Sequence, residues 1–223
     1  MDTANDNETK FKIIIFDMDG VLFDTIPLSK QNFIRRYPGV TEEMYIDMHA
    51  GNFHEKATSY SHLKIQETEE EHKQHLLDYA AKKKESKIFE GIKELLIELR
   101  NSGHILVINT NAYTRNCLPL LKNHGIDNLF EYIADADLTK DKVKKFELIE
   151  KKYKIDANKL LFITDALGDV LDADVARIPT VAVTWGVHDK AYFEKEKHLN
   201  LLAIVETVKD LRECIKNGNI STT

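Results

Sequence analysis

The segment Phe11–Thr25 reads F-K-I-I-I-F-D-M-D-G-V-L-F-D-T, and the interpretation of the whole chain starts from it. Its apolar run Ile13–Phe16 has the character of a strand that is buried on both faces of a sheet. Asp17, Asp19 and Gly20 follow at once. Ligands of open parallel sheets bind at the edge where the strands end, so this acidic turn is a candidate site. Asp and Gly also favour ordinary turns, and one such turn alone does not establish a site.

Beyond residue 87 the sequence alternates between strand-like apolar runs and segments with helical spacing. Each predicted helix carries apolar residues three or four positions apart, and glycine ends several of them. Strands joined by helices in this way form a parallel sheet with helices on both faces, so we predict an α/β fold. The predicted strands after the first are residues 105–108, 132–133, 160–164, 180–183 and 201–205.

Residues 26–86 have a different character, because helical patterns with short breaks replace the strand-like runs. Pro38–Gly39 and Ala50–Asn52 mark two of the breaks. The last of these helices is acidic at its start and rich in lysine at its end, which complements the helix dipole. We predict a small all-helical domain of residues 26–86, a core of residues 11–25 and 87–223, and a disordered tail of residues 1–10.

The composition is that of a soluble globular protein, with 43% apolar and 30% charged residues in a chain of 223. The formal net charge of −6 argues against nucleic acid or an anionic membrane as a partner, and it suits a site that binds a cation. No apolar run is long enough to span a bilayer. Cys117 and Cys214 have no partner motif and are expected to be reduced, which favours the cytoplasm. We expect a monomer or a weak homodimer.

Polar residues follow four of the predicted strands, and a parallel sheet brings the four loops to one edge. Carboxylates gathered there repel one another, and their burial is costly unless a cation lies among them. A set of oxygen ligands without His or Cys favours Mg²⁺, which we expect as the cofactor. The residues expected to converge are Asp17, Asp19, Thr110, Asn111, Lys140, Asp165 and Asp169.

This set of residues is suited to phosphoryl transfer. The Thr110 hydroxyl and the backbone N–H groups that follow it can hold one phosphate oxygen, because a helix is expected to start there. Lys140 can neutralise a second oxygen. An aspartate can attack phosphorus to form an aspartyl-phosphate. Asp19 is placed to give a proton to the leaving oxygen and later to take one from water.

The ordered motifs resemble those of the haloacid dehalogenase superfamily. Asp17–Thr25 is similar to the first motif, Ile108–Asn111 to the second, Lys140 to the lysine of the third and Thr164–Asp169 to the acidic fourth. The segment Thr180–Gly186 resembles the strand and turn of the phosphoglycolate phosphatase and beta-phosphoglucomutase-like branch. The resemblance covers nearly the whole chain from Phe11 onward.

The resemblance implies a Rossmann-like core, a helical cap at residues 26–86, and a Mg²⁺-dependent phosphatase that acts on a small phosphorylated metabolite through an aspartyl-phosphate. By this resemblance Asp17 is the nucleophile and a metal ligand. Asp19 is the acid/base and binds the metal through its backbone carbonyl. Asp165 is a further metal ligand, and Asp169 supports the metal site.

The chain departs from the family pattern at two positions of the fourth motif, where Thr164 replaces the usual Gly and Ala166 a common Ser. Both put the geometry of the metal loop in question. The third-motif lysine has close neighbours in sequence. We expect these to lie on a solvated helix face and therefore assign the phosphate-binding role to Lys140. The neighbours are Lys142, Lys144 and Lys145.

Three other functions share part of this pattern. A sugar phosphomutase uses the same groups but returns the phosphoryl group to the bound sugar. A receiver domain holds a phospho-aspartate for signalling, but it is shorter, lacks such an insert and carries its aspartate after the third strand. A dehalogenase has no use for Asp19 or for the acids of a metal site.

The polar residues of the insert allow two interpretations. The break at Gly51 is flanked by His49, Asn52 and His54, which either read the substrate at the catalytic edge or form an ordinary turn. We take Asn52 and His54 as the candidate substrate contacts. His72 and His75 are spaced for metal binding but are expected to be exposed. Two short crossings, at residues 25–27 and 86–89, are expected to act as a hinge.

Overall fold

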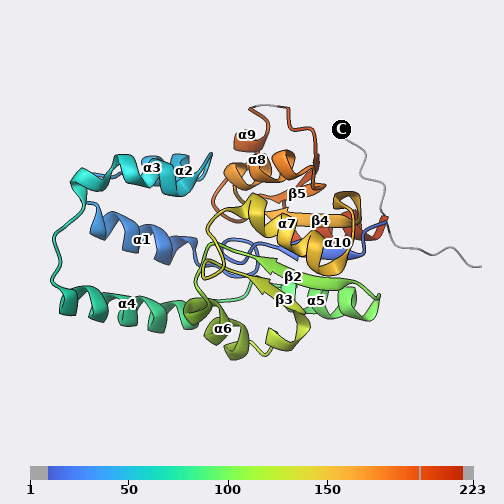
Figure 1. Cartoon of the computed structure of the whole chain (residues 1–223), viewed down its shortest axis with the longest axis horizontal. Coiled ribbons are helices and arrows are strands. Elements are labelled where there is room, and N and C mark those ends of the chain that lie inside the picture. The colour runs from blue at the N-terminus through green and yellow to red at the C-terminus, as the bar shows by residue number, and fades with distance from the viewer. Residues whose placement is uncertain (1–9, 196, 218–223) are drawn as a thin grey trace, which may run out of the picture.

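The computed structural model describes residues 10–195 and 197–217 of the chain (Figure 1). The predicted disordered tail lies outside the described residues, except for Lys10. The centre of the molecule is a sheet of six parallel strands in the order β3-β2-β1-β4-β5-β6. The predicted α/β fold is thereby confirmed. The strands are β1 Ile13–Phe16, β2 Ile105–Asn109, β3 Tyr132–Ala134, β4 Leu160–Thr164, β5 Thr180–Val183 and β6 Leu201–Val205.

Strand β1 lies in the middle of the sheet, paired with β2 on one side and β4 on the other. All four of its side chains are fully buried. Ile14 and Phe16 point into one core cluster, and Ile13 and Ile15 into another on the opposite face. Because side chains alternate along a strand, the residue after Phe16 continues the series of Ile13 and Ile15. That residue is Asp17, and this alternation directs it to the second face.

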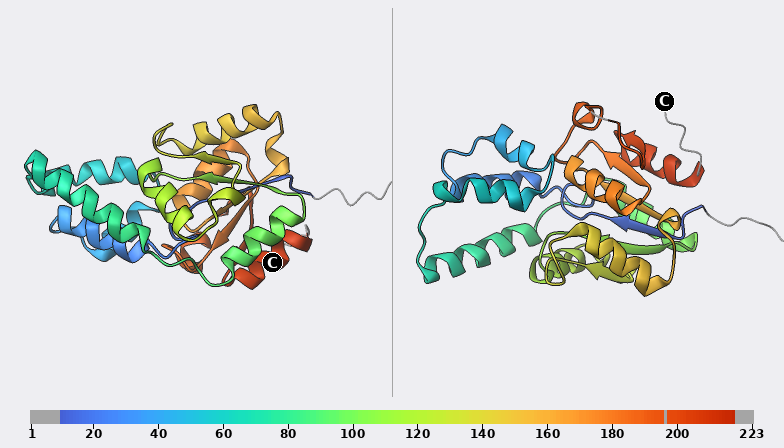
Figure 2. Two further views of the ribbon diagram at one scale, coloured as in Figure 1. Left: turned by 90° about the horizontal axis from the view of Figure 1, so that it is seen from below. Right: turned by 45° about the horizontal axis from the view of Figure 1, so that its top comes forward.

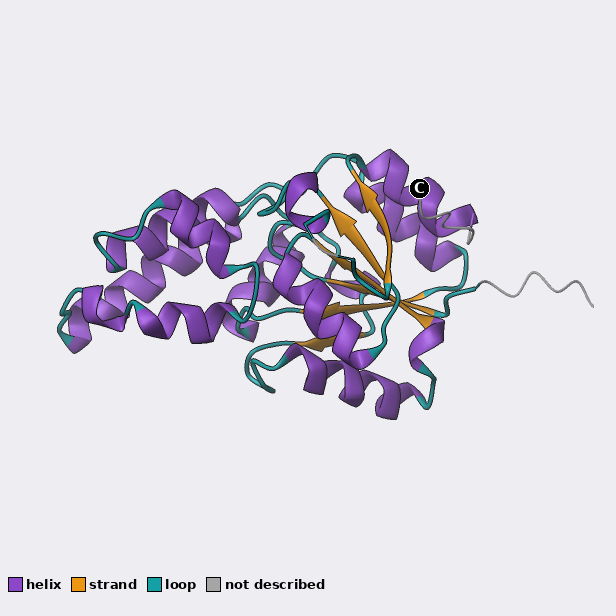
Figure 3. Cartoon of the chain, turned by 90° about the horizontal axis from the view of Figure 1, so that it is seen from above, coloured by secondary structure: helices purple, strands orange, loops and turns teal. Residues whose placement is uncertain are grey.

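Helices cover both faces of the sheet (Figure 3). The cluster around Ile14 and Phe16 includes side chains from α5, α6 and α10, and the cluster around Ile13 and Ile15 includes side chains from α7 and α8. The bounds are α5 Ile92–Asn101, α6 Thr114–Asn123, α7 Lys142–Tyr153, α8 Leu167–Ala176, α9 Lys190–Phe193 and α10 Val208–Asn217. Short 3-10 turns are η1 Ser61–Leu63, η2 Asp127–Leu129 and η3 Ala157–Lys159.

The insert forms four helices at one end of the molecule, on the left in Figure 1, and the other views show the same separation (Figure 2). They are α1 Ile26–Arg36, α2 Glu42–Met48, α3 Phe53–Ser59 and α4 Glu69–Lys84. The start of α4 is fixed by a capping box between Thr68 and Glu71. Leu76 of α4 is 37% exposed, and the helix buries His75 and Lys83 instead.

The two chain crossings between the sheet and the insert lie side by side. Asp24 N–H donates to Lys87 O at 2.9 Å, and Phe89 N–H donates to Leu22 O at 3.0 Å. Phe23 and Ile88 form an antiparallel bridge at the same place. The division of the chain into a core and a cap that move as separate domains stays a prediction.

None of the described helices combines the length and the apolar character needed to cross a membrane. Both cysteines are free thiols: Cys117 is a buried residue of α6, and Cys214 in α10 is half-buried.

Candidate active site

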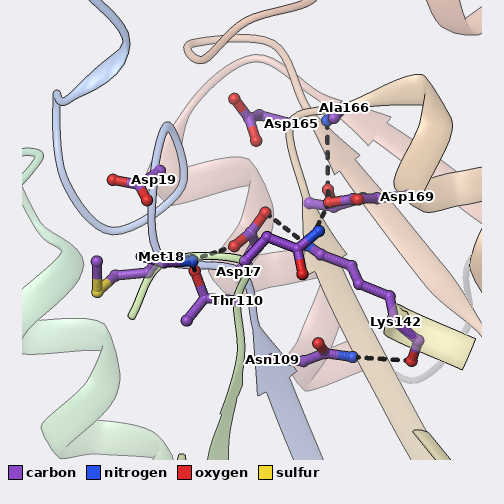
Figure 4. Close-up of polar contacts among 12 residues, drawn as sticks. Asp17, Met18, Asp19, Asn109, Thr110, Lys142, Asp165, Ala166 and Asp169 are labelled. Carbon is purple, nitrogen blue, oxygen red and sulfur yellow. Dashed lines mark hydrogen bonds and ion pairs between the residues drawn. The ribbon is translucent and has the colours of Figure 1, made fainter. Parts of the chain in front are cut away.

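The carboxylate of Asp17 stands at the end of β1 and is held by two donors (Figure 4). Met18 N–H donates to its Oδ1 at 2.6 Å, and Lys142 Nζ, from the first residue of α7, donates to its Oδ2 at 2.7 Å. The same ammonium group lies 2.6 Å from Oδ2 of Asp169, in the first turn of α8. One buried lysine therefore bridges two carboxylates that come from different loops.

Burial and charge together set the protonation of this pair. Burial raises the pKa of Asp17 to about 7, although Lys142 acts in the opposite direction. Burial would also raise the pKa of Asp169, but the Lys142 ammonium and the hydrogen bonds at its carboxylate hold that pKa below its usual value. Burial opposes the charge of Lys142, yet the two carboxylates raise its pKa above its ordinary range.

Thr164 explains one departure from the family pattern. Its hydroxyl donates to Asp169 Oδ2 at 2.7 Å and accepts from Ala166 N–H at 3.2 Å. The side chain therefore orients Asp169 and shapes the turn at the end of β4, which a glycine could not do.

Asp165 lies wedged between two glycine turns. A Cβ atom built on Gly20 or Gly186 would overlap with its carboxylate, so both positions require glycine. Gly20 also has φ +76°, a conformation that side chains disfavour. Val187 N–H donates to Asp165 Oδ2 at 2.7 Å. Burial, and then the neighbouring charge of Asp17, raise the pKa of Asp165 well above its ordinary value.

These carboxylates fit a hard divalent cation. Asp17 and Asp165 are buried and repel each other, while the Lys142 ammonium is shared between Asp17 and Asp169. An oxygen donor set of this kind suits Mg²⁺. In the described part of the chain, no three His, Cys, Asp or Glu side chains gather closely enough to hold a metal by themselves. Backbone carbonyl, water and substrate oxygens would have to complete the shell.

Asp19, two residues after Asp17, is held by the start of the insert and by its last helix. Thr25 Oγ1 donates to its Oδ1 at 2.5 Å, and Lys83 Nζ lies 2.8 Å from its Oδ2 and 2.7 Å from its Oδ1. Lys83 is only 2% exposed. Burial opposes its charge, but Asp19 raises the pKa of Lys83 above its ordinary range. Asp19, which is expected to bind the metal through its backbone carbonyl, and Asp169 stay predicted members of the metal site.

Thr110 follows β2 and is buried beside Asn111. Its hydroxyl accepts from Ala112 N–H at 3.2 Å. The expected helix does not begin there, since α6 starts only at Thr114. Lys145 Nζ instead fixes this turn, with bonds of 2.6 Å to Thr110 O and to Asn111 Oδ1. Burial, and then the charge of Lys142, lower the pKa of Lys145 to about 8.

The sequence matches a family model described as haloacid dehalogenase-like hydrolase over residues 14–183. The chain belongs to this family. The resemblance inferred from the four motifs is thus confirmed, and the protein is a hydrolase-family enzyme.

Curated relatives and solved structures extend this result. The hydrolase is 29% identical over 196 residues to phosphoglycolate phosphatases of Mannheimia succiniciproducens and Haemophilus influenzae, with 80% of this chain and 88% of each relative covered. A haloacid dehalogenase-like hydrolase structure from Bacteroides fragilis has a TM-score of 0.72 at 21% identity and covers 91% of this chain and all of the other. CbbY from Rhodobacter sphaeroides, solved with phosphate, has a TM-score of 0.71 at 18% identity and covers 90% and 96% of the two chains.

The structure of this hydrolase places Lys142, and not Lys140, against Asp17. Lys140 is exposed, with its Nζ 5.8 Å from the centre of the Tyr113 ring. The prediction that Lys142 and Lys145 lie on a solvated face was wrong, because both are buried and only Lys144 is exposed.

Helix α7 explains why Lys142 and Lys145 are buried. Asp141 caps the helix by accepting from Lys144 N–H at 3.1 Å, so Lys142 is its first residue. Lys142, Lys145, Phe146 and Ile149 then follow the spacing of one helical face, which is the face toward the sheet. That spacing was the signal in the sequence that identifies both lysines as buried.

A cavity of about 850 Å³ lies between the catalytic edge and the insert. Asn52 and His54 both line it. The side chain of Asn52 also caps α3, accepting from His54 N–H at 3.1 Å and from Glu55 N–H at 3.3 Å. Burial, and then the charges of Lys140 and Lys145, lower the pKa of His54 below its usual value. A substrate-binding role of Asn52 and His54 stays a prediction.

The loop that begins at His49 contacts the core directly. The carbonyl oxygen of His49 accepts from Gly168 N–H at 2.8 Å, and a Cβ atom on Gly168 would overlap with the backbone of Gly51. His188 Nε2 lies 3.1 Å from Ile46 O nearby. The insert therefore rests on the first turn of α8, directly above the catalytic edge.

Proposed function

We propose that this hydrolase is a Mg²⁺-dependent phosphatase that releases phosphate from a small phosphorylated metabolite through an aspartyl-phosphate. The observation that carries the proposal is the buried Asp17 carboxylate at the sheet edge, bridged by Lys142 to Asp169 and faced by Asp165. The phosphoglycolate phosphatases among its relatives support the same reaction class.

The carboxylates of Asp17 and Asp165 and the backbone carbonyl of Asp19 would hold the metal. When bound, Mg²⁺ neutralises these carboxylates and lets a negatively charged phosphate approach them. Lys142 takes the role that the sequence suggested for Lys140, because its ammonium is already in contact with the proposed nucleophile. The Thr110 turn, fixed by Lys145, offers a hydroxyl and backbone N–H groups to the phosphate.

The reaction then follows from the two aspartates of the first motif. An oxygen of Asp17 attacks phosphorus, the bond to the leaving oxygen breaks, and Asp19 donates a proton to that oxygen. Water next attacks the phosphorus of the aspartyl-phosphate while Asp19 accepts its proton. Inorganic phosphate leaves, and the Asp17 carboxylate is restored.

We also propose that residues 26–86 act as a cap that closes over residues 11–25 and 87–223, with the adjacent crossings as its hinge. Closure would exclude bulk water from the reacting phosphate. The net charge of −6 and the free thiols support a cytoplasmic enzyme, a monomer or weak homodimer, that binds neither nucleic acid nor membranes.

The test is a screen of phosphorylated metabolites with Mg²⁺, scored for inorganic phosphate. We expect release that stops with a chelator and returns with added Mg²⁺, and no release or phosphate trapping by Asp17→Asn. Asp19→Asn should lower turnover by about 10²–10⁴, the usual worth of general acid–base help. Activity that persists in chelator would contradict the proposal. Conversion of a sugar phosphate to its isomer without phosphate release would show a phosphomutase instead.

A further inference from the structure

The cavity above Asp17 is long, and one face of α1 runs along it. Ile26, Ser29, Phe33 and Arg36 all line it, and they share one side of the helix. Ten residue steps separate the first from the last, which at ~1.5 Å per residue is about 15 Å. The cavity therefore runs from the catalytic edge to the far end of the insert. Its volume of about 850 Å³ is in the range that encloses a drug-sized ligand.

One wall of the cavity is a polar ladder that α4 forms with α1 and with the turn after β1. Its three rungs are one helical turn apart. Lys83 pairs with Asp19, Tyr79 Oη lies 3.0 Å from Ser29 Oγ, and His75 Nε2 lies 2.5 Å from Asn32 Oδ1. All of these side chains also line the cavity. The ladder offers hydroxyl and amide groups to the middle of a bound molecule.

Another wall of the cavity is aromatic. The centre of the Phe33 ring lies 5.6 Å from that of Tyr45 and 5.5 Å from that of Phe53, and His49 lies 4.5 Å from Phe53. Tyr45 is almost fully buried, as expected of an ordinary core side chain. Phe33 and Phe53 remain partly exposed and line the cavity, so they present ring surface to it.

Arg36 lies at the far end of the cavity, and the described residues satisfy only part of the hydrogen-bonding capacity of its guanidinium group. Its Nε is buried without a hydrogen-bond partner among the described residues. Its terminal nitrogen lies 3.6 Å from Glu67, beyond hydrogen-bond distance. Arg36 lines the cavity and forms an ion pair with Glu67, and its terminal N–H groups can also meet acceptors on a ligand.

From these walls, and resting on the proposed phosphatase activity, we infer the class of substrate. It is a phosphate monoester whose leaving group ends in a flat aromatic or heteroaromatic ring with hydrogen-bond acceptors, as in a nucleoside 5′-monophosphate. The phosphate lies at Asp17, the hydroxyl-bearing middle lies along the ladder, and the ring lies against Phe33 and Phe53 with its acceptors toward Arg36. A small hydroxy acid such as glycolate would leave most of the cavity unfilled.

The experiment compares kcat/KM for a panel of nucleoside 5′-monophosphates, 2-phosphoglycolate and phenyl phosphate. We expect at least one nucleotide to exceed both small esters by about 10-fold or more, since contacts at 1.4 kcal/mol each give that factor. A preference for 2-phosphoglycolate would overturn the inference while leaving the phosphatase proposal intact. Failure of every ester, phenyl phosphate included, would remove the phosphatase proposal.

Two variants and a binding measurement make the result specific to the cavity. Arg36→Met should raise KM for the preferred nucleotide about 10-fold, the loss of one charged hydrogen bond, and leave phenyl phosphate unchanged. Lys73→Met is the control, because Lys73 is an exposed cation on α4 that does not line the cavity. Equal effects of the two variants would overturn the inference. Calorimetric binding of nucleotides to Asp17→Asn decides the matter if no turnover is seen: tighter binding than 2-phosphoglycolate supports the inference, and its absence overturns it.

Discussion

The sheet edge and the insert each contribute one buried lysine to an aspartate of the first motif, and the two differ in instructive ways. Lys142 and Lys83 are both 2% exposed. Lys142 lies on α7 in line with Phe146 and Ile149, on an apolar face that packs against the sheet. Lys83 lies on α4, whose only buried side chains are His75 and Lys83 itself. A core helix thus carries its lysine within an ordinary apolar stripe, whereas the insert helix buries only polar groups.

The largest expected effect comes from removing the ammonium that bridges two carboxylates. Lys142→Met leaves Asp17 and Asp169 close together without a counter-ion, which should cost about 3–5 kcal/mol of unfolding free energy. Turnover should fall by at least ~10²-fold, because the Lys142 ammonium is also expected to neutralise negative charge on the substrate phosphate. Both are measured by urea unfolding and by kcat/KM at saturating Mg²⁺.

Lys140→Met is the control for this change, since Lys140 is exposed and lies two residues earlier. It should alter stability by less than ~0.5 kcal/mol, as surface substitutions usually do. Should Lys140→Met prove the more damaging variant, the assignment of the phosphate-binding lysine would return to Lys140.

A smaller effect is expected at the lysine of the insert. Lys83→Met leaves Asp19 bonded to Thr25 but without its ammonium partner, so the orientation of the proposed acid/base group is less well fixed. We expect kcat to fall about 10-fold, less than the ~10²–10⁴ of losing Asp19 itself. The matched control is Lys84→Met, whose lysine is exposed. Unchanged kcat in Lys83→Met, with the fold intact by circular dichroism, would show that Lys83 serves only the packing of α4.

The last effect depends on pH and concerns Lys145, which is buried one turn after Lys142. Its pKa is about 8 in the folded protein and 10.5 as the ordinary value, so the unfolded chain binds more protons between these values. The free energy of unfolding should therefore increase as the pH rises from 8 toward 10.5. Lys145→Met should remove that contribution, and Lys144→Met should keep it. Denaturant titrations at several pH values measure how the free energy of unfolding changes with pH. Equal slopes in the two variants would show that Lys145 does not cause this change.

Much of the core could be predicted because its signals are local. The run Ile13–Phe16 and the polar residues after each strand indicate a parallel sheet with its site at one edge, and four motifs in order identify the family. The burial of Lys142 also has a local signal. Its spacing to Phe146 and Ile149 places it on the buried face of the helix, although lysine side chains are usually exposed.

The contacts of the insert could not be predicted in the same way. His75 was expected to be exposed, yet it is buried between Glu67 and Asn32. A polar residue on a helix without an apolar stripe carries no local sign of burial. Its partner Asn32 lies 43 residues earlier on another helix, so only the packing of α1 against α4 reveals this contact.

The two partners of Asp19 have a mechanical consequence. Thr25 immediately precedes α1, and Lys83 lies in the last turn of α4, so the carboxylate is fastened to the roots of both helices. Helix α1 runs from there to Arg36, and α4 runs back to Glu69. A tilt of either helix would displace the hydroxyl or the ammonium that orients Asp19. The position of the proposed acid/base group is therefore coupled to the packing of both insert helices.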